Sequence, residues 1–150
     1  RMPRKAAQPV YDENYKFALN KADIITKGND ITIVASGIMV AESLKAVLKL
    51  KEEGISAELI SANTIKPLDE ETILNSIKKT NHVVTCENHN VIGGLYSAVS
   101  EMLIEKYPLY VDKIAVMDQF GQVGKYSELL NYYHLTSNDI YNVVKKNLNK

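Results

Sequence analysis

The sequence has a single cysteine, Cys86, among 150 residues, and its eighteen basic residues balance eighteen acidic ones. One cysteine cannot form a disulfide within the chain, and such sparing use of cysteine is typical of proteins in a reducing cytoplasm. The balanced charge provides no electrostatic attraction to nucleic acid or to an anionic membrane. No apolar run approaches the ~20 residues of a membrane-spanning helix. We therefore expect a cytoplasmic protein with no nucleic-acid and no membrane partner.

Recognised motifs for nucleotides and metals are missing as well. A dinucleotide-binding turn would carry G-x-G-x-x-G, but the stretch "ASGIMVAESL" keeps only the first of these glycines, Gly37. A tight turn between a strand and a helix is the better interpretation of Gly37. Metal ligation needs three or four converging donors, and His82 and His134 have no ligand spacing with His89. No bound metal is expected.

What is present is a strand–helix alternation in a chain that is 45% hydrophobic. Strands are predicted within 22–29 and at 31–36, 55–61, 82–87 and 113–117. Helices are predicted at 40–54, 67–80, 95–103, 126–133 and after 136. Because the strands are nearly continuous in apolar residues and alternate with helices, the pattern favours a mostly parallel sheet covered on both faces.

Two helices carry specific expectations. In the helix at 40–54, the spacing of Val40, Leu44, Val47 and Leu48 predicts one apolar stripe that faces the core. In the helix at 67–80, Asp69 stands where a side chain can cap the first turn. We expect both features to hold their helices against the sheet.

The stretch "CENHNVIGG" holds the most suggestive polar residues. Cys86, Glu87 and His89 resemble parts of a nucleophile–base set or of a metal site, and Gly93 and Gly94 open a helix whose amides could bind an anion. Glu87 and His89 lie where a predicted strand ends, which is where α/β folds place polar function. We favour the structural alternative, in which Cys86 packs as a small apolar residue and the polar side chains order the loop.

Four stretches together resemble the C-terminal domain of transketolases: "ITIVASG", "TIKPLDEETI", "CENHNVIGGLYSAVSE" and "FGQVGKYSELLNYYHLTSNDI". The resemblance covers essentially the whole chain. It implies a three-layer α/β/α fold around a five-stranded mixed sheet of order 1-3-2-4-5, with strand 1 antiparallel. It also implies that residues 1–22 form a hinge from a preceding pyrimidine-binding domain and that residues 23–150 form the C-terminal domain. We expect the chain to begin inside a longer product or to follow processing.

The resemblance also implies a function within a larger enzyme. A complete transketolase of the pentose phosphate pathway uses thiamine diphosphate and Mg²⁺ to move a two-carbon ketol unit between sugar phosphates. The resemblance implies that both cofactors bind to domains outside this chain. The chain is then expected to be inactive alone and to act as a scaffold and dimer support. The basic lead with Arg1, Arg4 and Lys5 has the composition of a solvated charge run. The resemblance instead places Arg4 at the arginine that binds the substrate phosphate.

Partners and alternatives follow from the same resemblance. The expected partners are the N-terminal transketolase domains, in the same chain or in a separate subunit, within a homodimer of the complete enzyme. The strand order would reverse at a crevice formed by Gly37, Glu87, His89, Gly93 and Gly94, where an effector could bind. Alternative functions are the corresponding domain of deoxyxylulose-phosphate synthase or of a 2-oxo-acid dehydrogenase beta subunit. A third is a freestanding ligand-binding or regulatory module.

Overall fold

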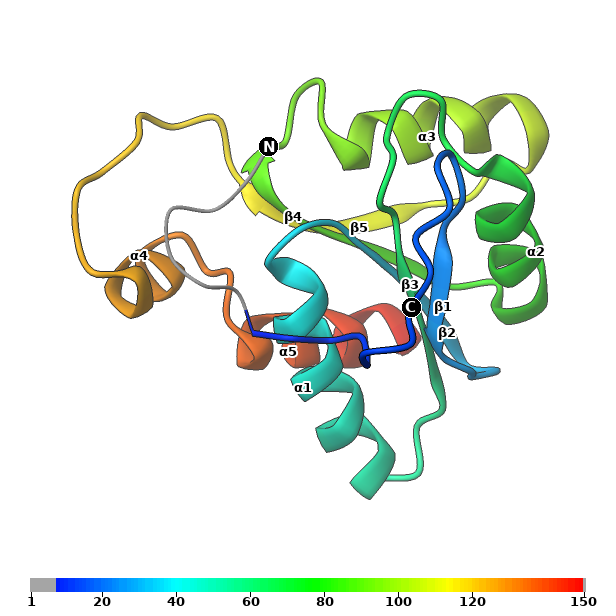
Figure 1. The fold of residues 1–150 in the computed structure, drawn as a ribbon, viewed down its shortest axis with the longest axis horizontal. Helices are drawn as coiled ribbons and strands as arrows, with labels where there is room; N and C mark the ends of the chain where they lie inside the picture. Colours follow the sequence, from blue (N-terminus) through cyan, green and yellow to red (C-terminus); the bar gives the residue numbers. More distant parts are fainter. Residues whose placement is uncertain (1–7, 150) are drawn as a thin grey trace.

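The computed structural model describes residues 8–149, which form five strands and five helices around one sheet (Figure 1). Residues 8–22 contain neither helix nor strand, and we call them the linker. The strands are β1 (Asp23–Thr26), β2 (Ile31–Ala35), β3 (Ala57–Ser61), β4 (Val83–Asn90) and β5 (Val111–Val116). The helices are α1 (Met39–Glu52), α2 (Glu70–Thr80), α3 (Leu95–Lys106), α4 (Tyr126–Tyr132) and α5 (Ser137–Leu148).

The sheet has the order β1-β3-β2-β4-β5, and β1 alone runs antiparallel to its neighbour. This confirms the expected order and the antiparallel first strand. Strand β4 extends three residues past the predicted end, to Asn90, and its pairing with β5 shifts register between Cys86 and Asn90. Strands β2 and β4 run parallel, and the crossovers that leave them lead to opposite sides of the sheet, to β3 and to β5, so the strand order reverses between β2 and β4.

Helices cover both faces of the sheet, and each face has its own core. Figure 1 shows α1 and α5 on one side of the sheet and α2 and α3 on the other, with α4 beyond the sheet. Side chains of β4 alternate between the two cores: Val84 and Cys86 pack in the α1–α5 core, and Val83 packs in the α2–α3 core. This alternation is the two-residue period of an extended strand.

The apolar stripe of α1 differs from the prediction at one position. Leu48 is 57% exposed, whereas Val47 and Leu50 are buried in the core. Successive residues of a helix are about 100° apart, so the stripe through Ala46, Val47 and Leu50 turns Leu48 toward solvent. The prediction was wrong because it counted Leu48 as a neighbour of Leu44 and overlooked the small residues that complete the buried face.

Asp69 caps α2 as predicted and also holds the end of the linker. Its carboxylate accepts hydrogen bonds from the Thr72 amide at 3.3 Å and from the Ala22 amide at 3.0 Å. Burial opposes ionisation, but these bonds and the nearby Lys21 ammonium hold the pKa of Asp69 below its usual 3.8. A carboxyl with a lower pKa in the folded state stabilises the fold above its unfolded pKa and ceases to do so as pH falls through the folded value.

Asp69→Ala is expected to lower the free energy of unfolding by about 1–2 kcal/mol at pH 7, the usual cost of losing an N-cap. Urea denaturation of both proteins from pH 7 to pH 2.5 measures the difference, which should shrink once pH falls below the unfolded pKa of 3.8. Asp69→Asn is the matched control because asparagine caps helices well without a charge. A difference that is constant over this pH range would contradict the role of the charge.

Candidate functional site

Glu87, the most suggestive carboxylate in the sequence, is a structural cap. Its side chain is 1% exposed and points to the start of α3, where it accepts hydrogen bonds from the amides of Leu95 at 2.8 Å and Tyr96 at 2.9 Å. These amides have no partner within the helix, and the positive end of the helix dipole favours a carboxylate there. The Glu87 carboxylate therefore accepts the hydrogen bonds that a bound anion would otherwise accept at this helix start.

The two glycines before α3 fit this carboxylate closely. A Cβ atom on Gly94 would lie 2.0 Å from Glu87 Oε2, so only glycine leaves room for the cap. Gly93 adopts a φ of +76°, and its amide donates to Ser97 Oγ at 2.9 Å. The amides of Gly93, Leu95 and Tyr96 thus have acceptors in Ser97 and Glu87, and they need no bound anion.

Cys86 and His89 flank Glu87 in the sequence, but the three side chains do not form a reactive group. Cys86 is fully buried against α1, and burial raises the pKa of its thiol to about 12, so it stays protonated near neutral pH. His89 is exposed, and its Nδ1 lies 3.0 Å from the carbonyl oxygen of Asn90. The three side chains therefore form no nucleophile–base pair.

Gly37 lies near this strand but on the opposite face from Glu87. A Cβ on Gly37 would approach Asn88 Oδ1 at 3.5 Å, and the neighbouring Ser36 amide donates to the Cys86 carbonyl. Because side chains alternate along β4, Asn88 faces Gly37 while Glu87 faces α3. The structure thus brings Glu87 and Gly94 together and separates them from Gly37.

An open groove of about 380 Å³ lies between the linker and the sheet, on the side of Gly37. Four linker residues form one wall of the groove. The other wall is formed by residues that come after β2 and by residues at the end of β3. The lining residues are Gln8, Pro9, Val10, Tyr11, Gly37, Val40, Ser61 and Asn63. Of the predicted crevice residues, only Gly37 lines this groove.

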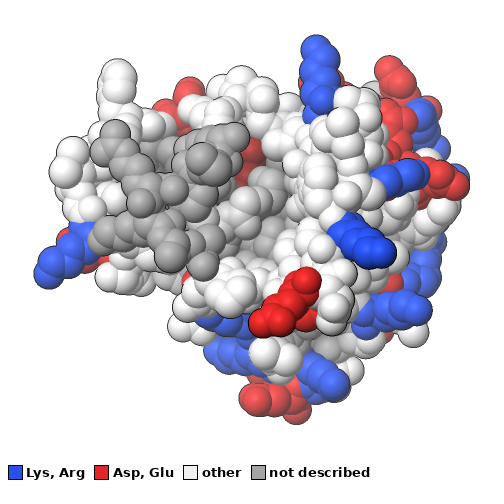
Figure 2. Space-filling view, viewed as in Figure 1, with Lys and Arg blue, Asp and Glu red and all other residues white. Residues whose placement is uncertain are grey.

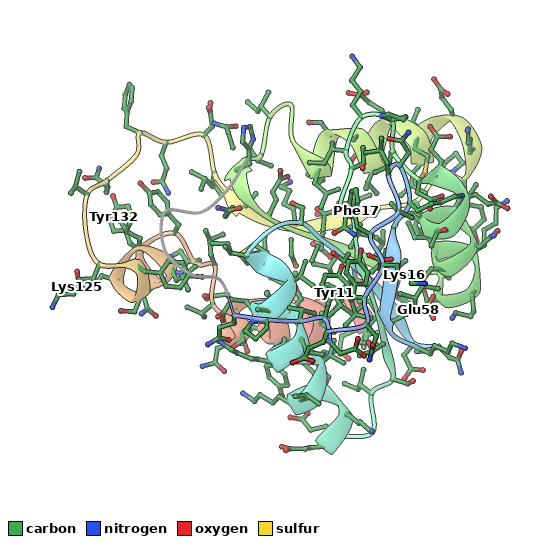
Figure 3. All side chains as sticks on the ribbon, viewed as in Figure 1. Tyr11, Lys16, Phe17, Glu58, Lys125 and Tyr132 are labelled. Carbon is green, nitrogen blue, oxygen red and sulfur yellow. The ribbon has the colours of Figure 1, made fainter. Side chains whose placement is uncertain are left out.

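A hydrogen-bonded group that the sequence analysis missed fixes the linker over this groove. Tyr11 and Tyr15 stack with ring centroids 3.8 Å apart, and both hydroxyls donate to Asp23 Oδ2, at 3.0 and 2.5 Å. Asn63, just after β3, donates to the same oxygen. We call Tyr11, Tyr15, Asp23 and Asn63 the linker clamp, and Figure 3 shows Tyr11 where the linker passes the sheet. In the sequence, the feature that could have revealed this group is a pair of tyrosines four residues apart in a segment without helical or strand periodicity.

Tyr15→Phe is expected to loosen the linker while the domain stays folded. Burial and the Asp23 carboxylate raise the pKa of Tyr15 above its ordinary value of 10.0, so its hydroxyl is a donor at neutral pH. Losing this charge-assisted bond, worth about 1–2 kcal/mol, should speed cleavage within residues 8–22 by about fivefold in limited proteolysis. Tyr132→Phe, at an exposed tyrosine on α4, is the control. Equal cleavage rates in all three proteins would contradict the clamp.

Arg4, the predicted phosphate ligand, lies outside the described residues. Within residues 8–149, no three His, Cys, Asp or Glu side chains come together as a metal site. No helix in the same part of the chain is long and apolar enough to cross a membrane. At the sheet edge where ligands commonly bind, the described side chains instead stabilise the fold and hold the linker.

Comparison with known proteins identifies relatives of the whole chain. The family described as "Transketolase, C-terminal domain" matches residues 20–140. The 6-deoxy-6-sulfo-D-fructose transketolase subunit SqwH of Clostridium sp. (strain MSTE9) is 45% identical over 140 residues, which are 93% of this chain and 44% of that protein. A putative transketolase C-terminal section of Methanocaldococcus jannaschii is 41% identical, over 100% of this chain and 48% of that protein.

A more distant relative and a solved structure extend this comparison. The 1-deoxy-D-xylulose-5-phosphate synthase of Heliobacterium modesticaldum is 35% identical over 85% of this chain and 20% of that protein. A structure described as a split gene transketolase, inactive beta4 tetramer, superposes with a TM-score of 0.92 at 40% identity, over 97% of this chain and 48% of that one. The chain thus spans about half the length of the first relatives named above. On the family match and these identities, the chain belongs to the transketolase C-terminal domain family.

Proposed function

We propose that this chain is the C-terminal module of a thiamine-diphosphate-dependent transketolase that moves a two-carbon ketol unit between sugar phosphates. The observation that supports this most is that the Glu87 carboxylate accepts two backbone hydrogen bonds at the start of α3. A carboxylate used in this way is not available for catalysis, and Glu87 was the best catalytic candidate in this domain. A domain of this family in which Cys86, Glu87 and His89 form no reactive group fits a supporting role. The chain is then inactive alone and supports a homodimer of the complete enzyme.

In this proposal the cofactors bind elsewhere. Thiamine diphosphate, when bound with Mg²⁺, supplies the electron sink for breaking and forming the carbon–carbon bond. Two observations support this: Glu87 occupies the amides at the start of α3, and within residues 8–149 no three His, Cys, Asp or Glu side chains come together as a metal site. The N-terminal transketolase domains, in the same polypeptide or in a separate subunit, would hold both cofactors.

The direct test is an assay of ketol transfer between sugar phosphates with thiamine diphosphate and Mg²⁺. We expect turnover when residues 1–150 are joined to or mixed with the N-terminal domains, and none from residues 1–150 alone. The alternatives, deoxyxylulose-phosphate synthase and a 2-oxo-acid dehydrogenase beta subunit, predict CO₂ release from a 2-oxo acid instead. Turnover by the chain alone, or CO₂ release without ketol transfer, would contradict the proposal.

Arg4 provides a second, residue-level test within the assembled enzyme. A guanidinium binds phosphate oxygens through two parallel hydrogen bonds, and a lysine ammonium cannot reproduce that geometry. Arg4→Lys is therefore expected to raise KM for a phosphorylated ketose by about tenfold and to leave kcat nearly unchanged. Arg1→Lys is the control in the same segment, and an unphosphorylated ketose is the control substrate. An equal rise in KM for both substrates would contradict phosphate binding by Arg4.

A further inference from the structure

The groove beneath the linker lies where a fold of this topology commonly binds ligands. Gly37 follows β2 and Ser61 ends β3, so the groove opens at the carboxyl ends of two neighbouring parallel strands. The linker forms the opposite wall, and Val10 in that wall packs against the α1–α5 core. The groove volume of about 380 Å³ is near the low end of the roughly 300–1,000 Å³ of small-molecule sites. Its size therefore fits a small molecule.

The residues that line the groove carry no charge. All eight are aliphatic, hydroxyl or amide residues, or glycine. Figure 2 shows most of the Lys, Arg, Asp and Glu side chains nearer the right and lower margins of this face. A charged ligand would lose hydration in the groove without meeting an opposite charge in the lining, and that loss is costly. The lining therefore favours an uncharged ligand.

The polar side chains of the lining use their hydrogens within the protein. The Ser61 hydroxyl donates to Asn63 Oδ1 at 2.9 Å, and the Tyr11 hydroxyl donates to Asp23 Oδ2 at 3.0 Å. Asn63 Nδ2 donates to Asp23 Oδ2 and to the Tyr15 hydroxyl oxygen. A hydroxyl that donates its one hydrogen still has lone pairs that accept. Ser61 and Tyr11 thus offer acceptor oxygens, and a ligand that matches them brings hydroxyl donors.

The linker clamp places three donors on one carboxylate oxygen. The two oxygens of a carboxylate share about four lone-pair sites, whereas Asp23 Oδ2 alone accepts from Tyr11, Tyr15 and Asn63. The bond from Tyr11 is the longest of the three, at 3.0 Å against 2.5 Å for the other two. Tyr11 also lines the groove, whereas Tyr15 does not. A ligand in the groove can therefore draw the Tyr11 hydroxyl away from Asp23 at the least cost to the clamp.

We propose that the groove beneath the linker binds a small uncharged polyhydroxyl compound of monosaccharide size, which hydrogen-bonds to Tyr11 and Ser61. Pro9, Val10 and Val40 provide aliphatic surface for the carbon skeleton of such a ligand. Because the linker forms one wall and the sheet side the other, a ligand that contacts both walls stabilises the clamped position of the linker. This binding is independent of the proposed ketol transfer.

NMR titration of the ¹⁵N-labelled chain with D-glucose tests the site, and D-gluconate is the charged probe with the same number of carbon atoms. We expect D-glucose to shift the amide signals of Gly37, Val40 and Asn63 saturably. The expected Kd is about 1–10 mM, which suits about twelve non-hydrogen atoms that bind without charge. D-gluconate should bind about tenfold more weakly or less. At a D-glucose concentration about ten times Kd, limited proteolysis within residues 8–22 should slow by about tenfold.

Ser61→Ala and Tyr11→Phe each remove one hydroxyl from the lining, and each should weaken D-glucose binding by about fivefold or more. Ser127→Ala and Tyr132→Phe, at exposed positions on α4, are the matched controls and should leave Kd unchanged. Circular dichroism verifies that each variant is folded. The site is overturned if no saturable shifts occur, if D-gluconate binds as tightly as D-glucose, or if both lining variants keep the original Kd. D-glucose binding that leaves the cleavage rate unchanged overturns the stabilisation of the linker.

Discussion

Glu87→Ala is expected to lower the free energy of unfolding by about 3 kcal/mol. The substitution leaves the buried amide of Leu95 and the partly buried amide of Tyr96 without acceptors, and an unsatisfied buried donor costs about 1–3 kcal/mol. It also removes negative charge from the positive end of the α3 dipole. Urea denaturation followed by circular dichroism measures the change, and hydrogen exchange at Leu95 and Tyr96 localises it.

His89→Ala is the control for this experiment, because His89 is exposed and contacts only the neighbouring carbonyl among the hydrogen bonds described. Its unfolding free energy should stay within about 0.5 kcal/mol of the unchanged protein. The pair separates the two interpretations of the "CENHNVIGG" stretch. A stable Glu87→Ala protein that has lost ketol transfer in the assembled enzyme would show a catalytic glutamate and contradict the structural assignment.

Gly28→Ala is expected to be equally damaging, by about 3 kcal/mol, for a steric reason. A Cβ at Gly28 would lie 2.2 Å from the Ala57 carbonyl carbon and 2.4 Å from the Glu58 amide nitrogen. Both atoms belong to the backbone of β3, so the strand itself must move, and overpacking of this kind costs about 1–3 kcal/mol or more. The movement also disturbs Glu58, a buried carboxylate that accepts hydrogen bonds from Lys79 and from the Gly28 amide.

Gly121→Ala is the matched control for this second prediction, because nothing lies within 4 Å of a Cβ there. We expect it to change the unfolding free energy by no more than about 0.5 kcal/mol. Thermal melts of the two proteins compare them directly. If the Gly28→Ala protein is as stable as the Gly121→Ala protein, β3 can shift at Ala57 without a loss in the free energy of unfolding, and the prediction is wrong.

Most of the fold could be predicted because it depends on patterns that a single sequence carries. The strand–helix alternation predicted the layers, and the resemblance supplied the strand order. The Asp69 cap followed from residue type and position alone, and the structure confirms it. The Leu48 prediction failed because the buried face of α1 includes Ala46, and a count of large apolar residues does not register so small a side chain.

The site was harder to predict because its geometry depends on contacts between distant segments. Glu87 was expected to order the loop, and its two bonds to α3 show how, but the space that Gly94 leaves for it is visible only in three dimensions. The linker clamp joins Tyr11 to Asn63, 52 residues apart, and no local pattern encodes such a pairing. Arg4 remains a prediction that depends on the resemblance.

The alternating side chains of β4 have a consequence for how this domain can vary. Val84 and Cys86 contribute to one core, whereas Val83 contributes to the other. Since substitutions at sites without shared contacts have additive effects on stability, changes behind α2 and α3 should combine independently with changes behind α1 and α5. Evolution, or an engineer, can therefore remodel one layer of the domain for a new neighbour while the opposite layer keeps its original packing.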